Sequence, residues 1–315
     1  PGVVGTPAVQ PLLGAFGIGA TENAQYDALE LPGQPGVYYV TLTVSGAPSG
    51  GAGGWDLMSA VLDTNKNPWS FAATTANDLA AMNTANDEFQ AGIEYDPKNP
   101  SVVVCVADIG DASLSSGAAA GVSTATIGAT GMPGAFSAPT RIDNVGTTVP
   151  LEYVDPNLAV INGQLKLLWI ETGSGNVYMG DFDYTKPSGS MVTNKTILIQ
   201  TPTGGIPGHQ YFHSISPIRR IDTGEATMFI CSDYNTTTGG SDSWFQSFTD
   251  RKETDAILVH DEASNWLANP MNIFGSLYYA NAPGGYTDPL EIHTCMCSGA
   301  DVPATRRTVQ LHVTT

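Results

Sequence analysis

A strand pattern that returns five times along the chain constrains the fold more than any other feature of the sequence. The five apolar segments are GVYYVTLTV near Val40, SVVVCVAD near Val104, LKLLWIE near Leu168, ATMFICSD near Ile230 and LEIHTCMC near His293. Their centres therefore lie 62 to 64 residues apart in a chain of 315 residues. Each segment follows a turn rich in Gly, Pro, Asp or Asn, and each precedes a second apolar strand. A fixed spacing of this kind indicates a repeat architecture.

One such unit holds about four short strands, too few to bury its own faces, so the units must pack around a common axis. We therefore expect an all-β fold, a five-bladed β-propeller that forms a single domain over residues 1–315. Its last strand, RTVQLHVTT, would close the ring by pairing with GVVGTPAV near the N-terminus. A tandem of β-sandwiches would give similar spacing and is the alternative. Residues 74–89, TTANDLAAMNTANDEF, are rich in helix formers and are expected to form a helix.

The charge balance bears on the partners of the protein. Twelve Lys and Arg face 30 Asp and Glu, and the net charge of −18 repels phosphate backbones, which excludes nucleic acid as a partner. An apolar run of about 18 residues is missing, so we expect no membrane insertion. The start at Pro1, the scarcity of lysine and the sequons at Asn194 and Asn235 favour a processed, secreted or periplasmic protein. We expect it to be a monomer.

The four cysteines are too few for a disulfide framework. Cys295 and Cys297 alternate with His293, so the three would share one face of a strand and could bind a soft metal ion. Burial of alternate strand positions explains the same pattern without a metal. His293 is the candidate metal ligand on the first interpretation.

Two aspartates stand at matching places in the repeat. Asp27 in AQYDALELPG and Asp155 in EYVDPNLAV are 128 residues apart, which is twice the repeat length. The innermost strand of each propeller blade faces the central channel, so residues repeated there converge on one pocket. His213 in HQYFHSISPI follows Asp155 by 58 residues, close to one repeat. Two carboxyl groups and a titratable group in one channel suit the cleavage of a glycosidic bond, whereas a turn cap is the alternative for each Asp.

Several segments resemble glycoside hydrolase family 43 and its five-bladed relatives. AQYDALELPGQPGVYYVTLT followed by GWDLMSAVLDTNKNPW is similar to the opening blade of that family. YVDPNLAVINGQLKLLWIE and ATIGATGMPGAFSAP are similar to its later segments. The resemblance implies that Asp27 is the general base that activates water and that Asp155 is a second acid that orients and tunes the others.

The sequence departs from the family in the fourth repeat. The family brings a glutamate there as the general acid, whereas HQYFHSISPIRR contains no acid. His209 or His213 would then protonate the leaving oxygen, since an imidazole titrates near neutral pH, and the spacing from Asp155 favours His213. A structural or substrate-binding role is the alternative for His213 and His209. Glu94 and Glu171 are fallback acids, although Glu171 ends a strand and could cap its turn.

The remaining candidates would bind substrate. Trp55 and Trp244 lie beside Gly- and Ser-rich loops and could stack on sugars, with core packing as the alternative. Arg219 could pair with an acidic sugar, and His209 could donate a hydrogen bond to the substrate. A calcium ion near the axis, as in relatives, would be structural, and no cofactor is required.

Together these features predict a secreted glycoside hydrolase that cleaves a plant or algal oligo- or polysaccharide with inversion in the central pocket. A non-catalytic glycan-binding or surface propeller is the alternative, because the glutamate is lost and only 13% of the residues are charged.

Overall fold

The structure is a computed structural model. It describes residues 24–45, 55–63, 65–66, 70–74, 76–110, 118–143, 154–171, 175–199, 209–220, 224–235, 240–248, 257–261, 277–280, 290–296 and 307–313. Within the strands, the side chains of residues 24–26, 44–45, 90, 118, 154, 209–214, 218, 220, 227–228 and 230–235 and those of β15 to β19 lie outside this description. The described residues contain strands and turns but no helix, which confirms the all-β expectation for this part of the chain.

The described strands form four sheets, each with a unit of four strands in which consecutive strands are antiparallel neighbours. The first sheet contains β1 (Ala24–Glu30), β2 (Val37–Ser45), β3 (Trp55–Asp63) and β4 (Ser70–Ala73). The second contains β5 (Phe89–Asp96), β6 (Asn99–Gly110), β7 (Ala118–Thr126) and β8 (Thr140–Arg141). The third contains β9 (Val154–Ile161), β10 (Gln164–Ile170), β11 (Val177–Phe182) and β12 (Val192–Ile199).

The fourth sheet has the same start and then an extension. It contains β13 (His209–Arg220), β14 (Ala226–Asn235), β15 (Gly240–Ser247), β16 (Ile257–Asp261), β17 (Leu277–Ala280), β18 (Leu290–Met296) and β19 (Arg307–Val313). Strands β13 to β16 follow the four-stranded order of the other sheets. Strand β17 pairs in parallel with β13 and continues into the antiparallel strands β18 and β19.

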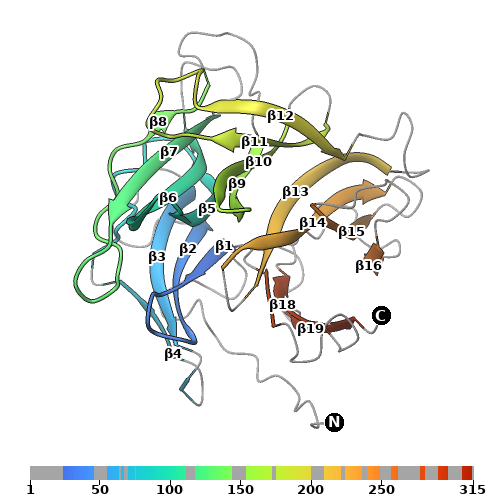
Figure 1. The fold of residues 1–315 in the computed structure, drawn as a ribbon, viewed down its shortest axis with the longest axis horizontal. Coiled ribbons are helices and arrows are strands. Elements are labelled where there is room, and N and C mark those ends of the chain that lie inside the picture. The colour runs from blue at the N-terminus through green and yellow to red at the C-terminus, as the bar shows by residue number, and fades with distance from the viewer. Residues whose placement is uncertain are drawn as a thin grey trace.

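The first strand of each four-stranded unit lies nearest the centre of the molecule. Figure 1 shows the sheets following one another around a common centre, with β1, β5, β9 and β13 innermost. Each of these strands contacts the next one around the ring, β1 with β5, β5 with β9, and β9 with β13. Residues remote in the sequence therefore meet along one axis.

The core consists of layers between successive sheets. On β6, Val103 and Cys105 pack toward the first sheet while Val104 and Val106 pack toward the third, and all four are fully buried. Leu168 on β10 likewise packs toward the fourth sheet. A strand covered on both faces needs a continuous apolar run, which is why SVVVCVAD does not alternate with polar residues.

The predicted helix at residues 74–89 is wrong for the part of this segment that the structure describes, which consists of turns and the start of β5. The side chains of Asn77 and Asn83 donate hydrogen bonds to the carbonyl oxygen of Leu57 on β3. Leu79 and Met82 are fully buried in the core between the first two sheets. The asparagine bonds and these two anchors favour an irregular segment over a helix.

One sequence prediction concerns a region beyond this part of the chain, and another concerns the membrane. The N-terminal segment expected to close the ring, residues 2–9, lies outside the described residues. Among the described residues we find no helix that is both long and apolar enough to span a membrane.

Candidate functional site

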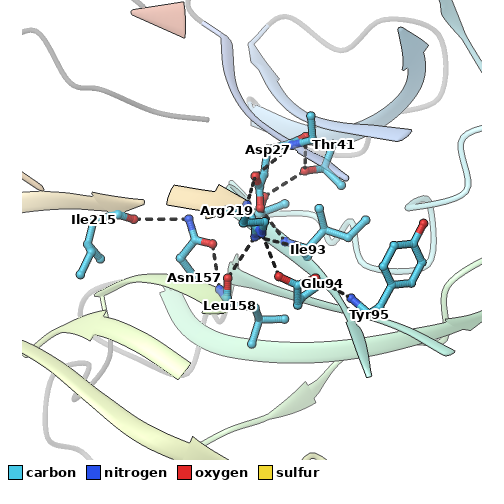
Figure 2. Close-up of polar contacts among 11 residues, drawn as sticks. Asp27, Thr41, Ile93, Glu94, Tyr95, Asn157, Leu158, Ile215 and Arg219 are labelled. Atoms are coloured by element: carbon cyan, nitrogen blue, oxygen red, sulfur yellow. Dashed lines mark hydrogen bonds and ion pairs between the residues drawn. The ribbon is translucent and has the colours of Figure 1, made fainter. Parts of the chain in front are cut away.

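A fully buried arginine on β13 meets two acids on other inner strands (Figure 2). The Nε atom of Arg219 lies 2.8 Å from Oε2 of Glu94 on β5. One terminal nitrogen of the same guanidinium lies 3.5 Å from Oδ1 of Asp27 on β1. Asp27 and Glu94 are each 2% exposed. We call these three residues the axial ion cluster.

The electrostatics of the axial ion cluster are a balance between burial and the arginine. Burial raises the pKa of Asp27, while Arg219 and the hydrogen bonds donated by the N–H groups of Ile93 and Ala28 act to lower it. Burial also raises the pKa of Glu94, and Arg219 again opposes this shift. The charge of Asp27 adds to the rise at Glu94. One guanidinium thus compensates two carboxyl groups that water hardly reaches.

The same arginine also fastens the inner strands to one another. Its second terminal nitrogen donates hydrogen bonds to the carbonyl oxygens of Ile93 on β5 and Leu158 on β9, at 3.1 and 3.0 Å. Beside it, the side-chain amide of Asn157 donates to the carbonyl oxygen of Ile215 on β13. Figure 2 shows these contacts converging on the guanidinium from several strands. Arg219 is therefore a buried counterion here, in place of the predicted contact with substrate.

Asp155 lies in a β-bulge at the start of β9. Leu168 pairs with Asn157 and Ile170 pairs with Val154, so both Asp155 and Pro156 lie opposite the single residue Trp169. Asp155 has a φ of 52°, in the left-handed region that a residue with a side chain rarely adopts. Bulges of this type place their first residue in that region and redirect its side chain. Proline is tolerated there because a bulge removes the need for its N–H.

A second carboxyl group, that of Asp108 on β6, faces Asp155. The N–H of Asp155 donates to Oδ2 of Asp108 at 3.4 Å, and both residues are buried. Oδ1 of Asp108 is buried and has no hydrogen-bond partner. Burial raises the pKa of Asp108 to about 7. Burial, and next the charge of Asp108, raise the pKa of Asp155 well above its usual range. We call these two residues the carboxyl pair.

The structure gives the two predicted acids different partners. Asp27 joins Glu94 and Arg219, whereas Asp155 joins Asp108. Glu94 was foreseen only as a fallback acid. Asp108 gave no sequence signal, since it ends the apolar strand SVVVCVAD and precedes a loop, where an aspartate is common.

The main chain places His213 at a bulge as well. Phe212 pairs with Asp233 and Ser214 pairs with Ser232, so His213 is the extra residue of β13. His213 and Asp155 therefore both lie at a bulge of an inner strand. The side chains of His213, His209, Trp244 and His293 lie outside the described residues, and their predicted roles remain predictions.

Two other candidates from the sequence, Trp55 and Glu171, have contacts that indicate structural roles. Trp55 is half-buried, and its ring lies 5.6 Å from that of Phe89 in a tilted arrangement. This favours the packing interpretation of Trp55. Glu171 pairs with Lys195, and its carbonyl oxygen accepts a hydrogen bond from Gly175 in the turn after β10. Glu171 thus caps a turn, as its position at a strand end indicated.

The described residues include no group of three or more His, Cys, Asp or Glu side chains that could hold a metal ion. Cys105 is a free, fully buried cysteine in the core.

Repeated four-stranded antiparallel sheets whose first strands gather around one axis define a β-propeller. Comparison with solved structures gives the same class. The chain is similar to a thermostable family-43 glycoside hydrolase, with 10% sequence identity over 91% of this chain and 88% of that one and a TM-score of 0.51. The resemblance to family 43 seen in the sequence is therefore shown in the fold.

A second similar structure is an exo-β-1,3-galactanase from Phanerochaete chrysosporium in complex with β-1,3-galactotriose. Its identity to this chain is 10% and the TM-score is 0.50. The match covers 86% of this chain but only 56% of the galactanase. A search with protein-family models and a search of curated proteins each gave no match.

Proposed function

We propose that this protein is a glycoside hydrolase built as one five-bladed propeller over residues 1–315, with the strands β17 to β19 as part of the fifth blade. In this proposal it is a secreted or periplasmic monomer that acts on a plant or algal glycan. The observation that carries the proposal is the setting of Asp155, a strained residue in the bulge of an inner strand beside a second buried carboxyl group. Strain and raised pKa values concentrate at functional sites.

The proposed reaction is a single displacement with inversion. Asp27 acts as the base, and the N–H groups and guanidinium around it favour the ionised form that a base requires. Asp155 is the second acid of the site. For the proton donor the sequence predicts His213, at the bulge of β13. An inverting site leaves room for one water molecule between base and sugar, with the two catalytic groups about 6.5 to 9.5 Å apart.

The fold neighbours suggest where to look for a substrate. The galactanase structure contains β-1,3-galactotriose, so we place β-1,3-galacto-oligosaccharides first among the compounds to test. Arabino-, xylo- and agaro-oligosaccharides complete the panel. The proposed chemistry draws only on side chains of the protein.

The test is product release from this panel by the wild type and by D155N, with E171Q as the matched control because Glu171 is paired with a surface lysine. We expect the wild type to cleave at least one substrate, D155N to lose at least about 100-fold in kcat, and E171Q to match the wild type. Proton NMR of the first product would show inverted anomeric configuration. Equal turnover by D155N and the wild type would contradict the proposal.

A non-catalytic glycan-binding propeller is the second candidate, and the setting of Asp27 favours it. The carboxylate of Asp27 is 2% exposed and is engaged by two N–H groups and an arginine. A base needs access to water. Calorimetric titration with the same oligosaccharides would then give saturable binding while no product forms over long incubation.

A further inference from the structure

The carboxyl pair offers a proton donor that the sequence did not reveal. This inference rests on the proposed hydrolase function and concerns the step for which the fourth repeat lacks a glutamate. We propose that Asp108 holds Asp155 in its protonated form, and that Asp155 rather than His213 donates the proton to the leaving oxygen. Asp108 acts through Asp155 and is therefore a positioning residue.

The first support is the backbone of Asp155. The bulge fixes this residue in the left-handed region, which costs about 1 to 3 kcal/mol for a residue with a side chain. Glycine would adopt the same φ without that cost. The structure therefore has a carboxyl group on a strained backbone at an inner strand.

The second support is the contact between the carboxyl group of Asp108 and the main chain of Asp155. The N–H of Asp155 donates to one oxygen of Asp108, which turns the Asp108 carboxyl group toward β9. The other oxygen of Asp108 is buried without a hydrogen-bond partner. A buried carboxylate oxygen left without a donor is costly, whereas a proton shared with a neighbouring acid removes that cost. The charge of Asp108 also raises the pKa of Asp155, because two neighbouring buried acids do not ionise together easily.

The third support is the charge on the strands packed against β9, which are β5, β6, β7, β10, β13 and β14. The charged residues and histidines on these strands are Glu94 and Asp96 on β5, Asp108 on β6, Lys166 on β10, His209, His213, Arg219 and Arg220 on β13, and Asp233 on β14. Arg219 pairs with Glu94 and Asp27, and Lys166 pairs with Asp181 on β11. These two cations are therefore engaged by other acids. The side chains of His209, His213, Arg220 and Asp233 lie outside the description.

The proposed step balances as follows. The O–H bond of Asp155 breaks as its proton moves to the glycosidic oxygen, and the bond from that oxygen to the anomeric carbon breaks with it. Water forms the new bond to the anomeric carbon and gives its proton to Asp27. The net reaction adds one water molecule across the bond, and proton exchange with solvent restores Asp155 and Asp27.

The first experiment is a titration that needs no substrate. Aspartate is labelled at the side-chain carboxyl carbon, and carbon-13 NMR follows the protein from pH 3 to 9, with the signals assigned from D108N and D155N. In the wild type we expect Asp108 to titrate near pH 7 and Asp155 to keep its proton well above the usual range of an aspartate. In D108N we expect Asp155 to titrate at least one pH unit lower. E88Q is the control, because Glu88 is another fully buried carboxyl group, near Asp56, and its loss should leave the pair unchanged. Complete ionisation of both aspartates by pH 5 would overturn the inference.

The second experiment is the pH profile of kcat on the best substrate. A proton donor limits activity at high pH, so D108N should move the basic limb at least one unit lower, whereas H213A should leave its position unchanged. The reverse result, with the limb moved by H213A and not by D108N, would overturn the assignment. If the carboxyl pair keeps a proton as expected but the protein cleaves no substrate, the proposed function and the donor role of Asp155 are both contradicted. The effect of Asp108 on the protonation of Asp155 would still be established.

Discussion

At the scale of single residues, the position of Asp155 directly before Pro156 has a physical explanation. A plain strand would bury Asp155 on one face and require an N–H at Pro156. The bulge removes this requirement and brings the main-chain N–H of Asp155 to the carboxyl group of Asp108. The sequence predicted that this aspartate matters, from its match with Asp27. It could not predict the partner, since Asp108 lies 47 residues earlier on a different sheet.

The left-handed backbone of Asp155 leads to a first prediction. D155A and D155G both remove the carboxyl group, but only D155A keeps a Cβ atom at a φ of 52°. We expect D155G to be more stable than D155A by about 1 kcal/mol, because a side chain in the left-handed region costs about 1 to 2 kcal/mol. Urea denaturation of the two variants measures the difference. A D155A variant as stable as D155G would show that residue 155 is not held in this conformation.

The axial ion cluster leads to a second prediction. R219M leaves Asp27 and Glu94 buried without their counterion, so we expect a loss of about 3 to 5 kcal/mol in the free energy of unfolding at pH 7. Burial already raises both pKa values, and removal of the arginine raises them further, so the loss should shrink as the pH falls toward 5. K195M, which breaks a partly exposed pair, should cost less than about 1 kcal/mol. An R219M variant as stable as K195M would contradict the account of the cluster.

At the scale of elements, the long apolar strands show how much of the fold the sequence predicts. The apolar runs of β2, β6, β10, β14 and β18 repeat at a constant spacing, and the structure has a strand at each of them. Bulges carry no such signal. The extra residue in β5, between Phe89 and Gly92, shows only in its pairing with β6. The segment before β5 was misjudged because its helix formers gave no sign that Asn77 and Asn83 would bind the edge of β3.

The packing of β5 on β9 leads to a third prediction. A Cβ atom at Gly92 would lie 2.8 Å from Oδ1 and 2.9 Å from Cα of Asn157. We expect G92A to cost about 1 to 3 kcal/mol, since the backbone of β9 would have to move. G128A is the control, because a Cβ there would lie at an ordinary 3.5 Å from the nearest atom, and its effect should stay within about 0.5 kcal/mol. Thermal unfolding compares the two, and equal stability would mean that β5 and β9 pack less closely.

At the scale of the whole molecule, stability should depend on pH through the carboxyl pair. Burial raises the pKa of Asp108 from 3.8 to about 7, so folding favours its protonated form. The stability from this group is fully present below its unfolded pKa and is lost as the pH rises through about 7. Between pH 5 and 8 we expect the wild type to lose on the order of 2 to 4 kcal/mol more than D108N.

Denaturant midpoints at the two pH values test this dependence. D183N is the control, since the pKa of Asp183 is lowered and its contribution is constant in this range. It should follow the wild type. Parallel curves for the wild type and D108N would mean that Asp108 is ionised throughout.

The arrangement around the axis could be predicted from the sequence because the repeat fixes it, and the two acids followed from their place in the repeat. The contacts inside the ring could not be predicted, since they depend on long-range pairs such as Arg219 with Asp27 and Glu94.

A crystal structure of D155N with a bound oligosaccharide, beginning with β-1,3-galactotriose, tests the central claim most directly. We predict five sheets around the axis and a sugar at the inner strands, with its glycosidic oxygen within about 3.2 Å of the side chain of residue 155. A sugar bound only at the outer strands, or a ring with another number of sheets, would contradict the account.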